Sequence, residues 1–195
     1  MNEALKMIAV LTLFCGLSSV TLASLKDATG NRIEEQVLTY VQGPAINQVL
    51  KDFDNSPVKD RKSFNIPGSD RKITVFPAMK DGKLFGVALE TSSKGYGGEV
   101  GVMVGFDVSG ENLSGIGITT MKETPGIGAR VAKHGFTNQF HNHPAAVELT
   151  SKGGDIDGIA GATISSTASV EAVKKAIDIF AKIKPKLEET WSQGS

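Results

Sequence analysis

The chain has 195 residues and no formal net charge, with 21 basic and 21 acidic side chains. This balance supplies neither a basic surface for nucleic acid nor an acidic tail, so a nucleic-acid-binding protein is excluded. The single cysteine, Cys15, excludes a disulfide framework, an iron–sulfur centre and a cysteine-based zinc site within one chain. Any redox chemistry therefore requires a cofactor that does not need thiol ligands.

The first predicted element is an apolar segment from Met7 to Leu25 that contains no charged residue. A helix of this length spans roughly 28 Å, close to the hydrocarbon thickness of a bilayer. A cleaved signal peptide is the alternative, with its cleavage site after the small residue Ala23. The length of the apolar run favours a single-pass membrane anchor over residues 1–30. The basic residues around the segment do not determine its orientation.

Residues 31–72 are predicted to form a helical and loop connector. Residues 33–40 continue or resume a helix. Residues 44–53 carry apolar side chains at helical spacing, with Pro44 near the start. Residues 54–70 are polar and contain Pro57 and Pro67, which predicts a loop.

A domain is expected over residues 73–195, and it begins with four predicted strands. The pair Asp81-Gly82 between the first two strands is a strong hairpin signal. The short connections between all four predict an antiparallel sheet. The predicted strands are residues 73–78, 84–91, 99–107 and 113–121.

Helices are predicted in the rest of the domain. Residues 125–140 read as short helices separated by glycines, and a long helix closes the chain. Ser165, Ser166 or Thr167 is expected to cap the long helix, and Pro185 to kink or end it. The order of helix, antiparallel strands and helices predicts an α+β fold.

A glycine-rich segment, Asp157 to Thr163, immediately precedes the last predicted helix. The free N–H groups and positive dipole at a helix N-terminus favour a phosphate group. Gly158 and Gly161 allow close backbone approach, and the segment is followed by the hydroxyls of Ser165 and Ser166. On these features alone, a phosphate site competes with an ordinary glycine-rich turn and cap.

The same segment resembles the flavinylation motif of the FMN-binding domain family, which is Asp, two variable residues, Ser or Thr, Gly, Ala and Thr. Asp157, Gly161 and Ala162 match the flanking positions, and Thr163 matches the acceptor. Ala160 departs from the motif, because a hydroxyl residue usually stands there. The resemblance implies that FMN is joined to this threonine through a phosphodiester.

In that family a dedicated flavin transferase takes the FMN from FAD. A threonine hydroxyl is a weak nucleophile until a base or metal activates it. No Ser–His–Asp-like arrangement is evident near Thr163 in the sequence. We therefore expect another enzyme to modify this chain, and we assign it no catalytic residue.

Two further segments are similar to the same family. The segment from Glu123 to Gly128 resembles a loop that lines the flavin, with Ile127 where the family has leucine. The segment from Lys94 to Gly98 resembles another loop, whose Tyr96 is expected at the flavin rim. Each segment alone is compatible with an ordinary turn, but the three motifs in this order are specific. The resemblance makes the following residues of the two segments candidates for contact with the flavin: Tyr96, Gly97, Glu123, Thr124, Pro125, Gly126, Ile127 and Gly128. Of these, Glu123 and Thr124 are expected to hydrogen-bond the isoalloxazine ring or the ribityl chain.

Other chemically suggestive residues are not assigned a site. His141 and His143 supply only two ligands, and with no cysteine to join them we predict no metal site. Trp191 is interpreted as a packing residue or a contact with the membrane interface, and not as a platform for a cofactor.

One anchor plus one FMN domain, with no other cofactor motif, is similar to the G subunits of the Rnf electron-transport complexes. Their relatives, the C subunits of the sodium-translocating NADH:quinone reductases, are the alternative. The resemblance implies an electron-transfer protein that is not an independent catalyst. Its complex would pass electrons between ferredoxin and NAD, coupled to sodium or proton transport.

The partners implied are the other subunits of that membrane complex and a flavin transferase. The domain is expected on the extracytoplasmic side of the cytoplasmic membrane. Two other functions stay open at this point: a stand-alone membrane-anchored flavin shuttle, and a non-redox binding or assembly module.

Overall fold

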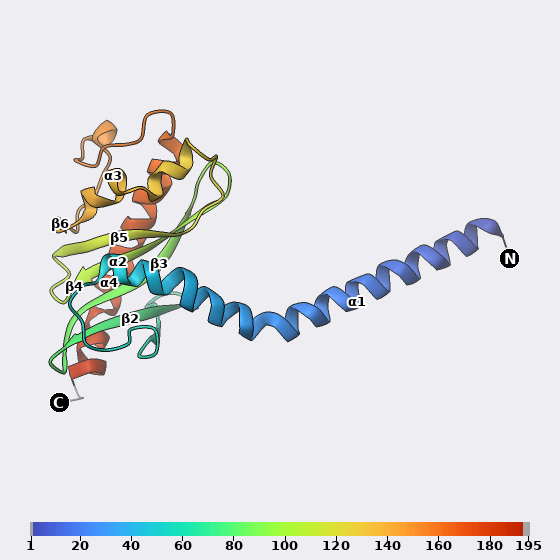
Figure 1. Ribbon diagram of the computed structural model, residues 1–195, viewed down its shortest axis with the longest axis horizontal. Helices are drawn as coiled ribbons and strands as arrows, with labels where there is room; N and C mark the ends of the chain where they lie inside the picture. Colours follow the sequence, from blue (N-terminus) through green and yellow to red (C-terminus); the bar gives the residue numbers. More distant parts are fainter. Residues whose placement is uncertain (1, 193–195) are drawn as a thin grey trace. The chain divides into compact units, whose positions relative to one another are not determined.

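The structure is a computed structural model that describes residues 2–192 and divides into two compact units, one up to Tyr40 and one from Val41 onward. The first unit contains helix α1 (Glu3–Val37) (Figure 1). Its stretch Glu3–Gly30 has a mean hydropathy of 2.0 and is long and apolar enough to cross a membrane. A retained membrane anchor and a signal sequence both meet these criteria of length and hydropathy. The criteria therefore do not distinguish an anchor from a signal sequence.

A π-helical turn η1 (Leu38–Gln42) and helix α2 (Gly43–Val49) follow α1 along the chain. The predicted helical continuation over residues 33–40 is therefore confirmed. The predicted helix over residues 44–53 is wrong at its end. Leu50 is extended and buried, and Asp52 has a φ of 59°, which a right-handed helix does not accept.

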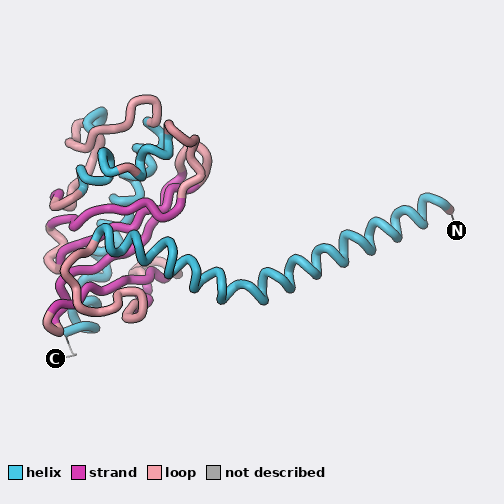
Figure 2. The backbone as a smooth tube through the Cα atoms, in the orientation of Figure 1, coloured by secondary structure: helices cyan, strands magenta, loops and turns pink. Residues whose placement is uncertain are grey.

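The second unit is built on one six-stranded antiparallel sheet whose strands follow sequence order. Its strands are drawn in magenta in Figure 2. The four predicted strands are confirmed as β2 to β5, and Asp81 and Gly82 both take positive φ in the predicted hairpin. The strands are β1 (Lys62–Asn65), β2 (Lys72–Lys80), β3 (Lys83–Lys94), β4 (Glu99–Asp107), β5 (Asn112–Thr120) and β6 (His143–Pro144).

Strand β1 lies inside the segment 54–70 that was predicted as a loop, so that prediction is wrong there. The strand pairs with β2, and its Phe64 is buried with the ring centroid 5.5 Å from that of Trp191. This contact is distant in sequence, so the local polar pattern did not reveal it. Strand β1 and helix α2 fall within the expected connector 31–72, yet both belong to the same compact unit as the sheet.

The long helix α4 (Thr163–Ser192) packs along one face of the sheet, against β3 and β4. The rings of Phe106 and Phe180 stack there with centroids 4.5 Å apart. Removing one of these rings would cost roughly 3–5 kcal/mol. This stack therefore helps to hold α4 on the sheet.

Helix α2 covers the face of the sheet opposite to α4. Adjacent residues on a strand point to opposite faces, so the neighbours of residues that contact α4 face α2. Gly105 precedes Phe106, and a Cβ there would lie 2.8 Å from the carbonyl oxygen of Val49. A Cβ at Gly117 would lie 3.4 Å from that of Ala45. Glycines on β4 and β5 thus let α2 approach the sheet closely.

Two predictions about α4 need correction. The helix begins at Thr163, so Ser165, Ser166 and Thr167 lie within its first turns and do not precede it as caps. Pro185 does not end the helix, which runs on to Ser192, while a kink at the proline stays a prediction. Ile183 and Leu187 flank the proline and are buried, so packing compensates for the missing backbone hydrogen bond.

Short helices between β5 and α4 are confirmed. They are η2 (Gly128–Ala132), α3 (His134–Thr137) and η3 (Asn138–Phe140), with a further turn η4 (Thr150–Lys152) before the glycine-rich segment. Trp191 is buried against Phe64, which confirms its interpretation as a packing residue.

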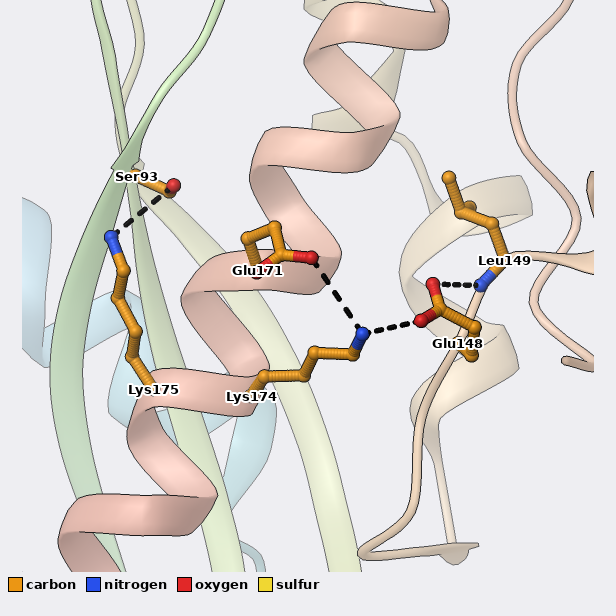
Figure 3. A network of polar contacts seen from close by, with 6 residues as sticks. All are labelled: Ser93, Glu148, Leu149, Glu171, Lys174 and Lys175. Carbon is orange, nitrogen blue, oxygen red and sulfur yellow. Dashed lines mark hydrogen bonds and ion pairs between the residues drawn. The ribbon is translucent and has the colours of Figure 1, made fainter. Parts of the chain in front are cut away.

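A polar network connects the segment just before η4 to helix α4 (Figure 3). Lys174 on α4 pairs with Glu148 at 2.5 Å and, one turn away, with Glu171 at 3.6 Å. Glu148 also accepts a hydrogen bond from the backbone N–H of Leu149. These hydrogen bonds and the positive charge lower the pKa of Glu148 and, reciprocally, raise the pKa of Lys174.

The change Glu148→Gln is expected to lower the free energy of unfolding at neutral pH, because the ion pair with Lys174 is lost. The pKa of Glu148 is lowered by folding, so its contribution is present above the ordinary carboxyl range and disappears as pH falls through the lowered value. Urea unfolding curves of variant and wild type should therefore differ at about pH 7 and converge at acidic pH, once Glu148 is protonated in the folded chain as well. Glu171→Gln, which removes the longer contact, should have the smaller effect; equal differences at both pH values would contradict this account.

Candidate functional site

A cavity of about 500 Å³ opens where three segments meet: the 95–98 loop, the 122–128 segment and the N-terminal turn of α4. The three segments are those that carry the sequence motifs. Its lining residues are Tyr96, Glu123, Thr124, Ile127, Gly128, Gly161, Ala162, Thr163, Ile164 and Ser165. Only Ile164 among them was not predicted as a site residue. Its position directly after the predicted acceptor was the one signal available.

Thr163 is exposed and is the first residue of α4. In the described part of the chain its hydroxyl has no hydrogen-bond partner. The first backbone bond of the helix runs from Ser166 N–H to Ala162 C=O, so the N–H groups of residues 163–165 have no partner within the helix. A free hydroxyl and free N–H groups therefore meet at one end of the cavity, an arrangement suited to a phosphate group.

The turn before Thr163 depends on Gly161 and Ser166. Gly161 has a φ of 79°, a left-handed conformation that glycine adopts without strain. The buried hydroxyl of Ser166 accepts a bond from Ile159 N–H and donates one to Ala162 C=O, both at 3.0 Å. Ser166 thus holds the turn and does not line the cavity.

Several predicted site residues lie outside the cavity lining. Asp157 is tied by its backbone to the side chain of Gln139, through an N–H bond of 2.7 Å and a bond to its carbonyl of 3.2 Å. Its carboxylate is exposed. The remaining predicted residues that the lining does not include are Gly97, Pro125, Gly126 and Gly158.

Glu123 is the most buried acidic residue of the site, with 7% of its surface exposed. One carboxylate oxygen accepts a bond of 2.6 Å from the hydroxyl of Ser165, and the other accepts a bond of 3.1 Å from the N–H of Gly97. This carboxylate therefore joins all three segments. The sequence suggested that it hydrogen-bonds a cofactor, whereas the structure directs both oxygens to donors of the protein.

Glycines surround that carboxylate because no side chain fits. A Cβ at Gly128 would lie 2.7 Å from Glu123 Oε2 and 2.6 Å from Ser165 Oγ. A Cβ at Gly95 would collide with the other oxygen of Glu123, and one at Gly97 with the carbonyl of Lys122. The glycines of two motifs therefore have a packing reason that does not depend on any ligand.

The two histidines singled out in the sequence have separate partners. His141 bonds through Nδ1 to the carbonyl of Ser114 at 2.6 Å, and His143 bonds through Nε2 to Asp155 at 2.8 Å. Within residues 2–192, no group of three or more His, Cys, Asp or Glu side chains is arranged to hold a metal ion.

Gly128→Ala is expected to lower the free energy of unfolding by about 1–3 kcal/mol, because the added methyl group displaces Glu123 or Ser165. Gly135→Ala is the matched control, since a Cβ there meets open space in helix α3. The control should change stability by less than about 1 kcal/mol. Thermal unfolding of the two variants measures the difference, and equal melting temperatures would contradict the packing role of Gly128.

Comparisons with known proteins identify a domain that contains the cavity segments. The sequence pattern of the FMN-binding domain matches residues 95–178, which include all three cavity segments. The G subunit of the ion-translocating oxidoreductase complex of Stutzerimonas stutzeri is 31% identical over 88% of this chain and 78% of its own length. The G subunit of the proton-translocating ferredoxin:NAD(+) oxidoreductase complex of Clostridium ljungdahlii is 27% identical over 86% of each chain.

The fold also matches a solved structure. The C subunit of the Na(+)-translocating NADH-quinone reductase from Parabacteroides distasonis superimposes with a TM-score of 0.54, covering 69% of this chain and 72% of that one. At 20% identity this likeness shows the fold alone. The α+β prediction is thereby confirmed. By its sequence and its FMN-binding domain, the chain belongs to the family of the G subunits of ion-translocating oxidoreductase complexes.

Proposed function

We propose that this chain is the FMN-carrying electron-transfer subunit of a membrane-bound, ion-translocating ferredoxin:NAD oxidoreductase complex. The similarity to the G subunits over most of both chains supports the assignment to such a complex. The observation that carries the flavin role is the exposed Thr163 at the head of α4, opening into the cavity that the three motif segments form.

The residues at this end of the cavity fit a phosphodiester of FMN on Thr163. The hydroxyl of Thr163 is accessible, and the unpaired N–H groups of residues 163–165 together with the helix dipole favour the negative phosphate. A Cβ at Gly161 would meet no atom within 4 Å, so the space beside this residue is free of protein. Thr163 is thus the residue we assign as the covalent acceptor.

The neighbouring hydroxyls are already used within the protein. Ser165 donates to Glu123, and Ser166 donates to the carbonyl of Ala162. Both serines are almost completely buried. An enzyme that approaches from solvent would therefore meet Thr163 first, which favours it as the single acceptor in this turn.

The walls of the cavity suit an aromatic ring system. Tyr96, Ile127 and Ile164 line it from the three segments, and they expose 73%, 49% and 53% of their surface. Burying apolar side chains under a flat ring is favourable by roughly 25 cal/mol per Å². When bound, FMN supplies the electron transfer, while this chain supplies binding, orientation and electrostatics.

The proposal extends to the partners and the location of the chain. Helix α1 would anchor it in the cytoplasmic membrane as a single span, with the FMN domain on the extracytoplasmic side. A flavin transferase would attach the FMN, and the other subunits of the complex would donate and accept the electrons. A role in the sodium-translocating NADH:quinone reductase, whose C subunit has the same fold, is the alternative.

Thr163→Ala is expected to abolish covalent flavin, because the hydroxyl that forms the ester bond is absent. The chain and a flavin transferase would be expressed together, and the product examined by fluorescence after denaturing electrophoresis and by intact mass. Thr163→Ser keeps a hydroxyl and should retain the adduct. Thr167→Ala, one turn further along α4, is the matched control and should label like the wild type.

Two results would refute the assignment. A wild-type chain without a fluorescent band or FMN mass adduct would refute the flavin role and leave a binding or assembly module. A band that persists in Thr163→Ala would refute the acceptor and direct attention to Ser165, Ser166 or Thr167.

Co-purification distinguishes a member of a complex from a shuttle. An affinity-tagged chain isolated in mild detergent from its own membranes should bring down large multi-span subunits with additional flavins and iron–sulfur clusters. A tagged chain that purifies alone, with its flavin still attached, would support the membrane-anchored shuttle and contradict the proposed complex.

A further inference from the structure

We propose that Glu123 places a fixed negative charge at the wall of the flavin cavity and thereby lowers the reduction potential of the FMN on Thr163. This inference rests on the proposed function, because it concerns a flavin at that site. In this role Glu123 acts on the flavin through its charge. It does not need to form a hydrogen bond with the flavin.

The geometry fixes the carboxylate in one orientation. Both oxygens are bonded to donors that lie on different segments, Gly97 N–H at 3.1 Å and Ser165 Oγ at 2.6 Å. The backbone N–H can only donate, and the two contacts together suit an ionised carboxylate. Gly95 and Gly128 close the remaining sides, since a Cβ at either would meet a carboxylate oxygen. The charge is therefore held in one place.

Within residues 2–192, no ion pair neutralises this charge. In the described part of the chain, Glu123 forms no ion pair with lysine, arginine or histidine. Its two donors are neutral groups, which lower the cost of burial but leave the net charge in place. With 7% of its surface exposed, the side chain is also poorly screened by water.

The sign of the effect follows from the chemistry of the flavin. Uptake of two electrons and one proton adds one negative charge to an oxidised flavin ring. A fixed anion in the wall of the same cavity repels that added charge, and more strongly in a partly buried site than in water. Reduction is therefore disfavoured, and the midpoint potential moves to a more negative value.

Removal of the charge tests this role. In Glu123→Gln the side chain keeps its size and loses its charge, so the midpoint potential of the attached flavin should shift to a more positive value. Glu111→Gln is the matched control for net charge. Glu111 is exposed in the turn after β4, whereas the 95–98 loop precedes that strand. The control should leave the potential unchanged.

Ser165→Ala provides an opposite test. It removes one neutral donor and leaves the charge of Glu123 less compensated, so at an alkaline pH that keeps the carboxylate ionised the potential should shift to a more negative value. A purely structural role of Glu123 would not produce shifts of opposite sign in these two variants. The measurement is a spectroelectrochemical titration of each full-length chain carrying covalent flavin, at one pH and one ionic strength.

Each outcome decides the matter. A flavin-loaded Glu123→Gln chain with the wild-type potential overturns the inference while leaving the proposed function intact. If Glu123→Gln accepts no flavin, Ser165→Ala decides, because an unchanged or more positive potential there also overturns it. A wild-type chain without flavin refutes the proposed function itself, and this inference with it.

Discussion

The contact on which the site depends is the buried carboxylate of Glu123, bonded at once to Gly97 and to Ser165. It connects three segments that are far apart in the sequence, and it fixes their spacing without any ligand. The stacked pair of Phe106 and Phe180 has the complementary role, because it helps to seat α4, the helix that carries Ser165, on the sheet. The core therefore positions the helix, and one carboxylate gathers the loops around the end of that helix.

This arrangement explains how one turn can contain three hydroxyl residues with different roles. Ser166 holds the turn by bonding to Ile159 N–H and Ala162 C=O, and Ser165 is committed to Glu123. Thr163 alone is exposed at the cavity. Since a buried hydroxyl is costly to release from its partner, local structure separates the one exposed hydroxyl from its two buried neighbours.

The extent of what the sequence predicts follows from how local each signal is. The four central strands and the Asp81-Gly82 hairpin were predicted, because alternation and turn chemistry are local features. The protein family was also predicted, because the spacing of residues in a motif is local too. Strand β1 was missed because Phe64 is buried by Trp191 from the other end of the domain. The course of α4 through Pro185 was likewise decided by distant packing, which overrides a local preference.

The hydrogen bonds of Glu123 show most clearly what a motif leaves out. A motif places an acidic residue beside a flavin loop and suggests direct contact with the ligand. Only the fold reveals that Gly97 and Ser165 each donate to one of its oxygens, and that a side chain at Gly95 or Gly128 would meet the same carboxylate. The glycines and the glutamate thus form one unit, in which each glycine makes room for the charge. A site built this way has its electrostatics set by the protein before the cofactor arrives, and a flavin attached at Thr163 would enter a field that is already in place.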